Sequence, residues 1–134
     1  MTSTIILDNP SVTLWFHPDT GIVHHKIHKF IWGKEFREFL QAGAKVLAER
    51  RARKWLSDDR GNSVLSKEDL EWSHASWAPQ VVRAGWKYWA IVQPEKVLAQ
   101  FTMQGLVTKY AGLGVSAKFF TDPQAAMRWL EGQP

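Results

Sequence analysis

The segment from residue 88 to residue 92, YWAIV, constrains the fold of this chain more than any other stretch. It is apolar throughout, whereas a strand with one face in water alternates apolar and polar residues. A continuous run of this kind indicates a central strand that is covered on both faces, as in the sheets of α/β proteins. Gly85 is expected to end the helix before this strand, and Pro94 to open the helix after it.

Two further strands are predicted near the N-terminus, joined as a hairpin. Residues 11–17 (SVTLWFH) carry apolar side chains at alternate positions, and residues 22–28 (IVHHKIH) return as the second strand. Residues 18–21 (PDTG) have the chemistry of a turn, since proline presets φ and glycine tolerates positive φ. Residues 1–10 are expected to form an extended N-terminal segment.

The apolar period changes from that of a strand to that of a helix after residue 34. Five residues at helical spacing form the stripe of an amphipathic helix: Phe36, Phe39, Leu40, Gly43 and Leu47. The helix is expected to end in the cations of residues 50–53, where the helix dipole favours positive charge. A short strand at residues 55–56 follows.

Three more helices are predicted in the rest of the chain. Ser66 with Asp69 resembles a capping box and starts the first of them, and Pro79 must kink or restart it because proline lacks the backbone donor. Another helix is expected over residues 94–110. Residues 122–123, an aspartate followed by proline, start the last one after a strand that ends the sheet.

The predicted order of elements is ββαβαβαβα. Such an alternation implies an α/β fold with a mixed five-stranded sheet, right-handed crossovers and about four helices. No repeat, low-complexity segment or linker divides the chain. We therefore expect residues 1–134 to form a single domain.

Composition excludes several classes of function. The chain has no cysteine, which rules out disulfides, thiolate catalysis and cysteine zinc sites, and its net charge of +4 is too small to indicate a nucleic-acid binder. The basic residues 50–54 are interpreted as a solvated helix end. Eight tryptophans are spread over nearly every element, which favours a role in the core. No apolar run approaches the roughly 18–20 residues of a transmembrane segment. No signal peptide is apparent, so a cytoplasmic protein is expected.

A dispersed set of residues resembles the pattern of bacterial SpoIIAA-like proteins, which are often described as STAS/SEC14-like. The set comprises Trp55, Leu56, Asp58, Arg60, Glu68, Asp69, Trp72, Trp77, Pro79, Gly85, Ala90, Val92, Pro94, Phe120, Asp122, Ala126, Trp129 and Leu130. The resemblance implies a fold related to anti-sigma-factor antagonists and to the CRAL-TRIO lipid-binding domain. It covers nearly the whole chain after Ser11.

The resemblance also implies a switch by phosphorylation, because the best-understood members carry a phosphorylated serine in an Asp-Ser-Ser/Thr-Gly setting after the third strand. Here that junction reads LSDDRGNS over residues 56–63. Ser63 and Ser66 lie nearby but lack the flanking residues. The sequence therefore departs from the family at the switch itself.

The triplet Asp58-Asp59-Arg60 is the strongest candidate for a site. It follows a predicted strand, and ligands of open α/β sheets bind beyond the carboxyl ends of strands. We interpret it, with Ser63 and Ser66, as an interaction rim in which Asp58 is mainly structural while Asp59 and Arg60 are exposed contacts. The alternative is a polar loop in which an aspartate caps the backbone and Arg60 pairs with it.

Histidines do not predict a metal site. His24 and His28 share a face of the hairpin but lie about 13 Å apart at ~3.3 Å per residue. His17 is expected near Ile22 or His24, which gives two ligands at best. His25 is expected to be a satisfied, semi-buried histidine on the opposite face.

The sequence therefore predicts a non-catalytic regulatory or protein-interaction module. We expect no enzyme activity and no cofactor, and we expect another protein as the partner, with a homodimer left open. The alternative function is a carrier or sensor of a small apolar ligand, held in a pocket under the later helices as the CRAL-TRIO likeness implies.

Overall fold

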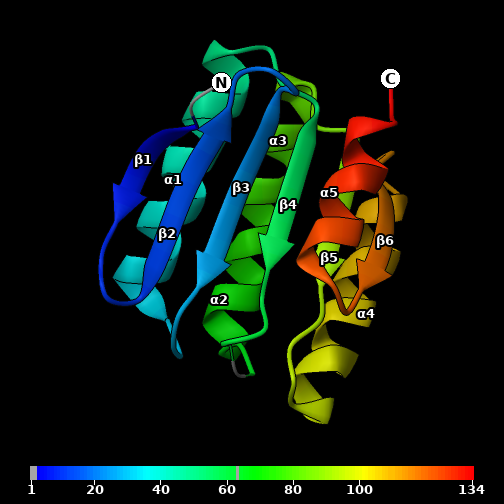
Figure 1. Cartoon of the computed structure of the whole chain (residues 1–134). Coiled ribbons are helices and arrows are strands. Elements are labelled where there is room, and N and C mark those ends of the chain that lie inside the picture. Colours follow the sequence, from blue (N-terminus) through cyan, green and yellow to red (C-terminus); the bar gives the residue numbers. More distant parts are fainter. Residues whose placement is uncertain (1–2, 63) are drawn as a thin grey trace.

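The described residues, 3–62 and 64–134 of a computed structural model, form one mixed sheet whose strands follow chain order (Figure 1). The strands are β1 (Thr4–Asp8), β2 (Val12–His17), β3 (Ile22–Ile27), β4 (Lys54–Asp58), β5 (Tyr88–Val92) and β6 (Ser116–Phe120). β1 pairs with β2 and β2 with β3 antiparallel, and the other neighbours are parallel.

The helical segments are α1 (Gly33–Glu49), α2 (Lys67–Trp72), η1 (Ser73–Trp77), α3 (Ala78–Ala84), α4 (Val97–Ala111) and α5 (Pro123–Glu131). Because α2, η1 and α3 follow one another without a break, the described chain has four helices in the order βββαβαβαβα. The α/β class and the number of helices are as predicted.

The predicted five-stranded sheet is wrong, because the N-terminal segment adds a sixth strand. β1 lies at the sheet edge, and its register against β2 shifts between Ile5 and Leu7. As a result Ile6 and Leu7 both pack against the core while Ile5 is exposed. Three consecutive apolar residues with no alternation gave no strand signal in the sequence.

The two faces of the sheet are covered unequally. α1, the α2–α3 helix and α4 lie behind the sheet in Figure 1, whereas α5 alone lies in front, over β4, β5 and β6. On the α5 side Leu56 and Ala90 pack with Ala126 and Leu130 in a small core. The larger core fills the opposite side.

The apolar run of β5 is buried on both faces, as predicted. Trp89 and Ile91 belong to the larger core, and Ala90 and Val92 to the core beneath α5. The strand is bonded to parallel neighbours on both sides, β4 and β6.

The second helix begins at the predicted cap. The Asp69 amide donates to Ser66 Oγ at 3.1 Å. The Asp69 carboxylate does not return to Ser66: Oδ2 accepts from the Gly33 amide at 2.9 Å, and Oδ1 lies 3.5 Å from Arg37 Nε. Asp69 thus ties the start of α2 to the start of α1.

Pro79 is predicted to kink or restart the second helix, and the helix there changes from π-helical to α-helical without a break. η1 widens the helix immediately before α3, which carries Pro79 in its first turn. Pro94, by contrast, does not start a helix, since α4 begins at Val97. The Gln93 amide donates to the Phe120 carbonyl at 2.9 Å, so the chain continues along β6 beyond the end of β5 before it turns.

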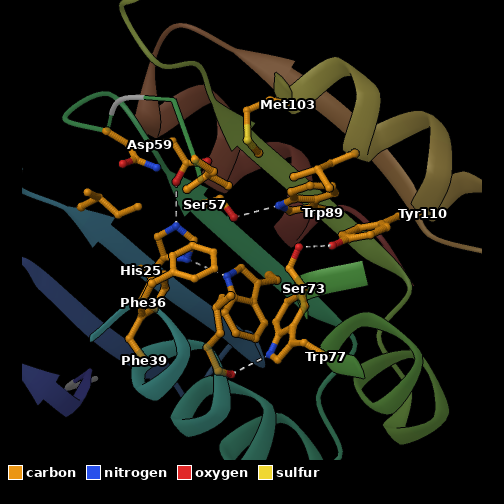
Figure 2. A pocket seen from close by; sticks show the side chains of 16 residues that line it. His25, Phe36, Phe39, Ser57, Asp59, Ser73, Trp77, Trp89, Met103 and Tyr110 are labelled. Carbon is orange, nitrogen blue, oxygen red and sulfur yellow. Dashed lines mark hydrogen bonds and ion pairs between the residues drawn. The ribbon is translucent and has the colours of Figure 1, made fainter. Parts of the chain in front are cut away.

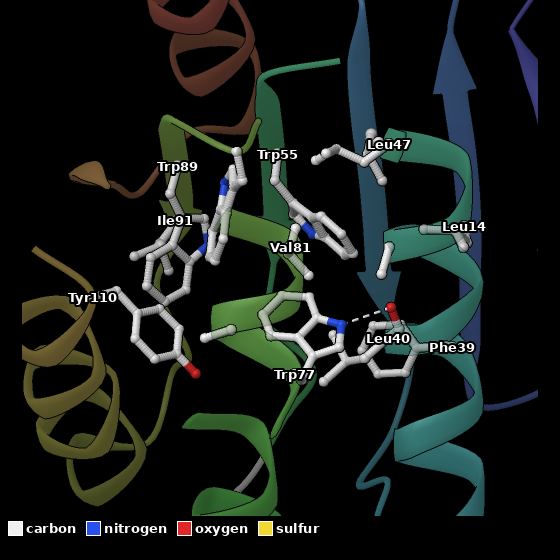
Figure 3. Close-up of a cluster of buried hydrophobic side chains, with 14 of the residues drawn as sticks. Leu14, Phe39, Leu40, Leu47, Trp55, Trp77, Val81, Trp89, Ile91 and Tyr110 are labelled. Carbon is white, nitrogen blue, oxygen red and sulfur yellow. Dashed lines mark hydrogen bonds between the residues drawn. The ribbon is translucent and has the colours of Figure 1, made fainter. Parts of the chain in front are cut away.

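Trp55 lies at the centre of the larger core, against tryptophans from the second helix and the segment after it (Figure 3). Its ring centroid is 5.2 Å from that of Trp77 and 6.2 Å from that of Trp86. α1 approaches the other side of the ring at Gly43, where an added Cβ would overlap the indole. Glycine is therefore required here for close packing, although it lowers helix propensity.

Replacing Gly43 with alanine is expected to lower the free energy of unfolding by about 1–2 kcal/mol. Overpacking costs about 1–3 kcal/mol, which exceeds the roughly 0.5–1 kcal/mol that alanine gains over glycine in a helix. Gly105 in α4 is the matched control, because an added Cβ there would meet nothing within 4 Å. Chemical denaturation should show G105A stabilised and G43A destabilised. Equal stabilisation of both variants would contradict the close contact with Trp55.

Candidate functional site

A partly open cavity of about 50 Å³ lies between the inner face of the sheet and the helices α1, η1 and α4 (Figure 2). It is at the carboxyl end of β4, where ligands of open α/β sheets bind. Its apolar lining is Ile27, Phe36, Phe39, Leu40, Trp55, Leu65, Trp77, Trp89, Met103 and Leu106. Its polar lining is His25, Ser57, Asp59, Asn62, Ser73 and Tyr110.

A buried chain of hydrogen bonds runs from the tryptophan core into this cavity. Trp55 Nε1 donates to His25 Nδ1 at 2.9 Å, and His25 Nε2 lies 2.8 Å from Asp59 Oδ1. Because an indole nitrogen only donates, Nδ1 must be unprotonated and Nε2 must carry the proton. His25 is thus a neutral imidazole whose two nitrogens are both used, as expected for a satisfied buried histidine.

Two hydroxyl pairs complete the inner wall of the cavity. Ser57 Oγ accepts from Trp89 Nε1 at 2.8 Å. Ser73 Oγ donates to the Leu70 carbonyl at 2.9 Å and accepts from the Tyr110 hydroxyl at 3.3 Å. Burial raises the pKa of Tyr110 to about 12, so the phenol stays protonated at neutral pH.

Asn62 is the unusual residue of the site. Asn62 lies on a loop that turns sharply after β4. Its backbone N–H donates to the Asp59 backbone carbonyl at 3.0 Å. Gly61 permits this path, because a Cβ there would lie 2.5 Å from the Ile27 carbonyl oxygen. Asn62 is only 6% exposed, and its Oδ1 has no hydrogen-bond partner. A buried acceptor left unpaired costs about 1–3 kcal/mol, so it calls for a partner from outside the chain.

The residues of the predicted interaction rim do not share one surface. Asp58 and Arg60 line a separate groove with Lys26 and Glu95, whereas Asp59 lines the cavity. Ser66 caps α2, and Ser63 lies outside the described residues.

Asp58 and Arg60 form the ion pair that the sequence left open as an alternative. Arg60 Nε donates to Asp58 Oδ1 at 2.9 Å and Nη2 donates to Oδ2 at 2.7 Å. Burial alone would raise the pKa of Asp58, but the hydrogen bonds and the charge of Arg60 outweigh it and hold that pKa below its usual value. Asp58 is buried in this pair, whereas the Arg60 side chain is still 38% exposed.

The expectation that Asp59 is an exposed loop charge is wrong. The residue is 3% exposed and accepts the proton of His25 Nε2. The chain turns inward directly after β4, and the Asp59 amide donates to the Val92 carbonyl at 3.1 Å, which holds the residue against the sheet.

Histidines on the opposite face make a pair but no larger cluster. His17 Nε2 lies 2.9 Å from His24 Nδ1, one of the two placements predicted from the hairpin. Burial, with the neighbouring His17 and His25, lowers the pKa of His24 to about 3. Across residues 3–62 and 64–134, no group of three or more histidine, cysteine, aspartate or glutamate side chains is arranged to hold a metal ion.

Several cavity residues were missed by sequence reasoning: Ser57, Asn62, Ser73, Trp89 and Tyr110 as members of one site. The Gly61-Asn62 pair reads as an ordinary turn, and the remaining residues occupy strand or helix positions with no local signal. Their proximity is set by tertiary packing alone.

No family model, curated protein or solved structure matches this chain. In the described part of the chain, none of the helices has the length and apolar character required to cross a membrane.

Replacing Asp59 with alanine is expected to lower the free energy of unfolding by about 1–3 kcal/mol, because the buried His25 Nε2–H would lose its acceptor. Glu38→Ala is the control, since its side chain is 59% exposed and such a change should stay within about 0.5 kcal/mol. Urea denaturation of both variants measures the difference. A D59A variant as stable as E38A would mean that Asp59 behaves as the surface charge first expected.

Proposed function

We propose that this chain is a non-catalytic module that binds a small molecule with an apolar body and a polar end in the cavity beneath α4. The observation that carries the proposal is the unpartnered Asn62 Oδ1 in an otherwise largely apolar cavity. Ligand sites of this kind combine an apolar lining with a few convergent polar groups. The proposal corresponds to the carrier or sensor that the sequence offered as its alternative.

Three features favour binding over catalysis. Both nitrogens of His25 are engaged within the protein, so the imidazole offers no free lone pair as a general base. The Ser57 hydroxyl accepts a hydrogen bond from the Trp89 indole N–H, and such a donor does not activate a nucleophile. The Tyr110 hydroxyl stays protonated and bonds to Ser73.

The size of the cavity limits what it takes in. Its volume of about 50 Å³ exceeds the roughly 10–15 Å³ that one water needs, but it is below the ~150 Å³ that accommodates benzene. Because the cavity is partly open, a ligand can place its polar end inside and rest its apolar body on Met103 and Leu106 of α4. Methionine adapts readily to such a contact.

A second candidate function, association with another protein, is favoured by the outer side of α4. Val97, Leu98 and Phe101 are all exposed there, although large apolar side chains on one helix usually face a core. With Met103 and Leu106 on the cavity side, the helix would connect ligand and partner, which suits a regulatory module. The expected kinship with SpoIIAA-like STAS domains stays part of this proposal, and the order of elements after β1 is the one predicted from the sequence.

Filling the cavity should abolish ligand binding. Leu106 lines the cavity and is 7% exposed, whereas Leu98 on the same helix is 70% exposed. We expect Leu106→Trp to block binding of short-chain alkyl probes and Leu98→Trp to leave it unchanged. The measurement is an NMR titration that follows the indole N–H signals of Trp55 and Trp89, with thermal unfolding as a check that both variants fold.

Signals that move in the wild type and in L98W but not in L106W would support the site. If no probe with any end group shifts these signals in a way that depends on residue 106, the proposed function is wrong.

A further inference from the structure

The polar groups of the cavity have unequal remaining capacity for hydrogen bonds. His25 uses both nitrogens, and the hydroxyls of Ser73 and Tyr110 bond to each other and to a backbone carbonyl. Asn62 Oδ1 has no donor at all. Asp59 has two carboxylate oxygens with about four lone-pair sites, and the described hydrogen bonds give its side chain a single donor, His25.

The electrostatic balance of the cavity is also uneven. The hydrogen bond from Trp55 fixes His25 as the neutral Nε2–H form, so His25 does not compensate the charge of Asp59. Among the described residues, His25 is the one side chain that pairs with the Asp59 carboxylate. A carboxylate that is 3% exposed is expected to be paired, since burying an unpaired charge is costly.

The neighbouring carboxylate shows the contrast. Asp58 is equally buried but receives two hydrogen bonds from the Arg60 guanidinium, on the far side from the cavity. Of two adjacent aspartates, the chain thus supplies a cation to one and leaves the other facing the cavity with a neutral partner.

We infer that the ligand of this cavity carries a primary ammonium group, which Asp59 and Asn62 Oδ1 bind together. This inference rests on the proposed function and specifies its ligand. An ammonium supplies three donors and a positive charge, and it accepts nothing. These properties match Asn62 Oδ1, which lacks a donor, and the Asp59 carboxylate, whose described partner His25 is neutral. A carboxylate end group would place a like charge beside Asp59 and would leave Asn62 Oδ1 without a donor.

The lining suits the rest of such a ligand. Trp89 and Met103 line the same cavity as Asp59 (Figure 2), and both present soft apolar surface. Aromatic faces add a favourable contact to a cation at short range. Short aliphatic amines are the class of molecule that combines these features within the available volume.

Three probes with the same alkyl chain test the end group: n-propylammonium, 1-propanol and propionate. They differ in charge from positive through neutral to negative. NMR titration of the Trp55 and Trp89 indole signals at neutral pH is expected to show n-propylammonium binding at least about tenfold more tightly than 1-propanol, as befits a charge-assisted hydrogen bond. Propionate should be weakest.

Two matched variants locate the effect. Asp59→Asn keeps an acceptor for His25 but removes the charge, so it should reduce n-propylammonium affinity to that of 1-propanol. Asp58→Asn removes a neighbouring charge that does not line the cavity and should leave the preference for the amine intact. Thermal unfolding of both variants confirms that they fold.

The outcomes separate this inference from the proposed function. Binding of 1-propanol or propionate as tightly as n-propylammonium, or an amine preference that survives D59N, would overturn the ammonium assignment and leave the site as a neutral-ligand cavity. If no probe shifts the indole signals of the wild type in a way that depends on residue 106, the proposed function itself is wrong.

Discussion

The hydrogen bond from the Trp55 indole to His25 is the interaction on which the rest of the inner face depends. Trp55 is 1% exposed, and a buried indole N–H left without an acceptor would cost about 1–3 kcal/mol. His25 supplies the acceptor from the neighbouring strand β3, and in doing so it must carry its own proton on Nε2. Asp59 then has to be buried to accept that proton. The need to pair the buried Trp55 indole thereby fixes the protonation of His25 and the burial of Asp59 at the carboxyl end of β4.

The other buried tryptophans follow the same rule and shape the cavity. Trp77 donates to the Leu40 carbonyl of α1 at 2.8 Å, and Trp86 donates to the Tyr88 carbonyl at 3.1 Å. Trp89 donates to Ser57 at 2.8 Å. Each indole thus takes up one acceptor, and Trp77 and Trp89 themselves line the cavity. Among the described residues that line the cavity, Asn62 Oδ1 stays without a donor, and we propose it as the group that binds a ligand.

Features that repeat along the chain were predictable from the sequence, and features made by packing were not. The apolar run of β5 and the stripe of α1 were predicted because periodicity reports directly on burial. β1 was missed because an edge strand with a register shift shows no alternation. Asp59 was misjudged because two adjacent carboxylates before Arg60 look alike locally, and only the inward turn after β4 distinguishes them. Asn62 carried no signal, since its importance lies in a hydrogen bond that is not made.

The protonation form of His25 tests this interpretation of the site most directly. Long-range ¹H–¹⁵N correlation spectra of the ligand-free protein at neutral pH distinguish the two neutral tautomers from the imidazolium. We expect the proton on Nε2 alone, with Nδ1 unprotonated and accepting from Trp55. A proton on Nδ1, or on both nitrogens, would break the chain from Trp55 to Asp59 and contradict the conclusion that Asp59 faces the cavity without a cationic partner.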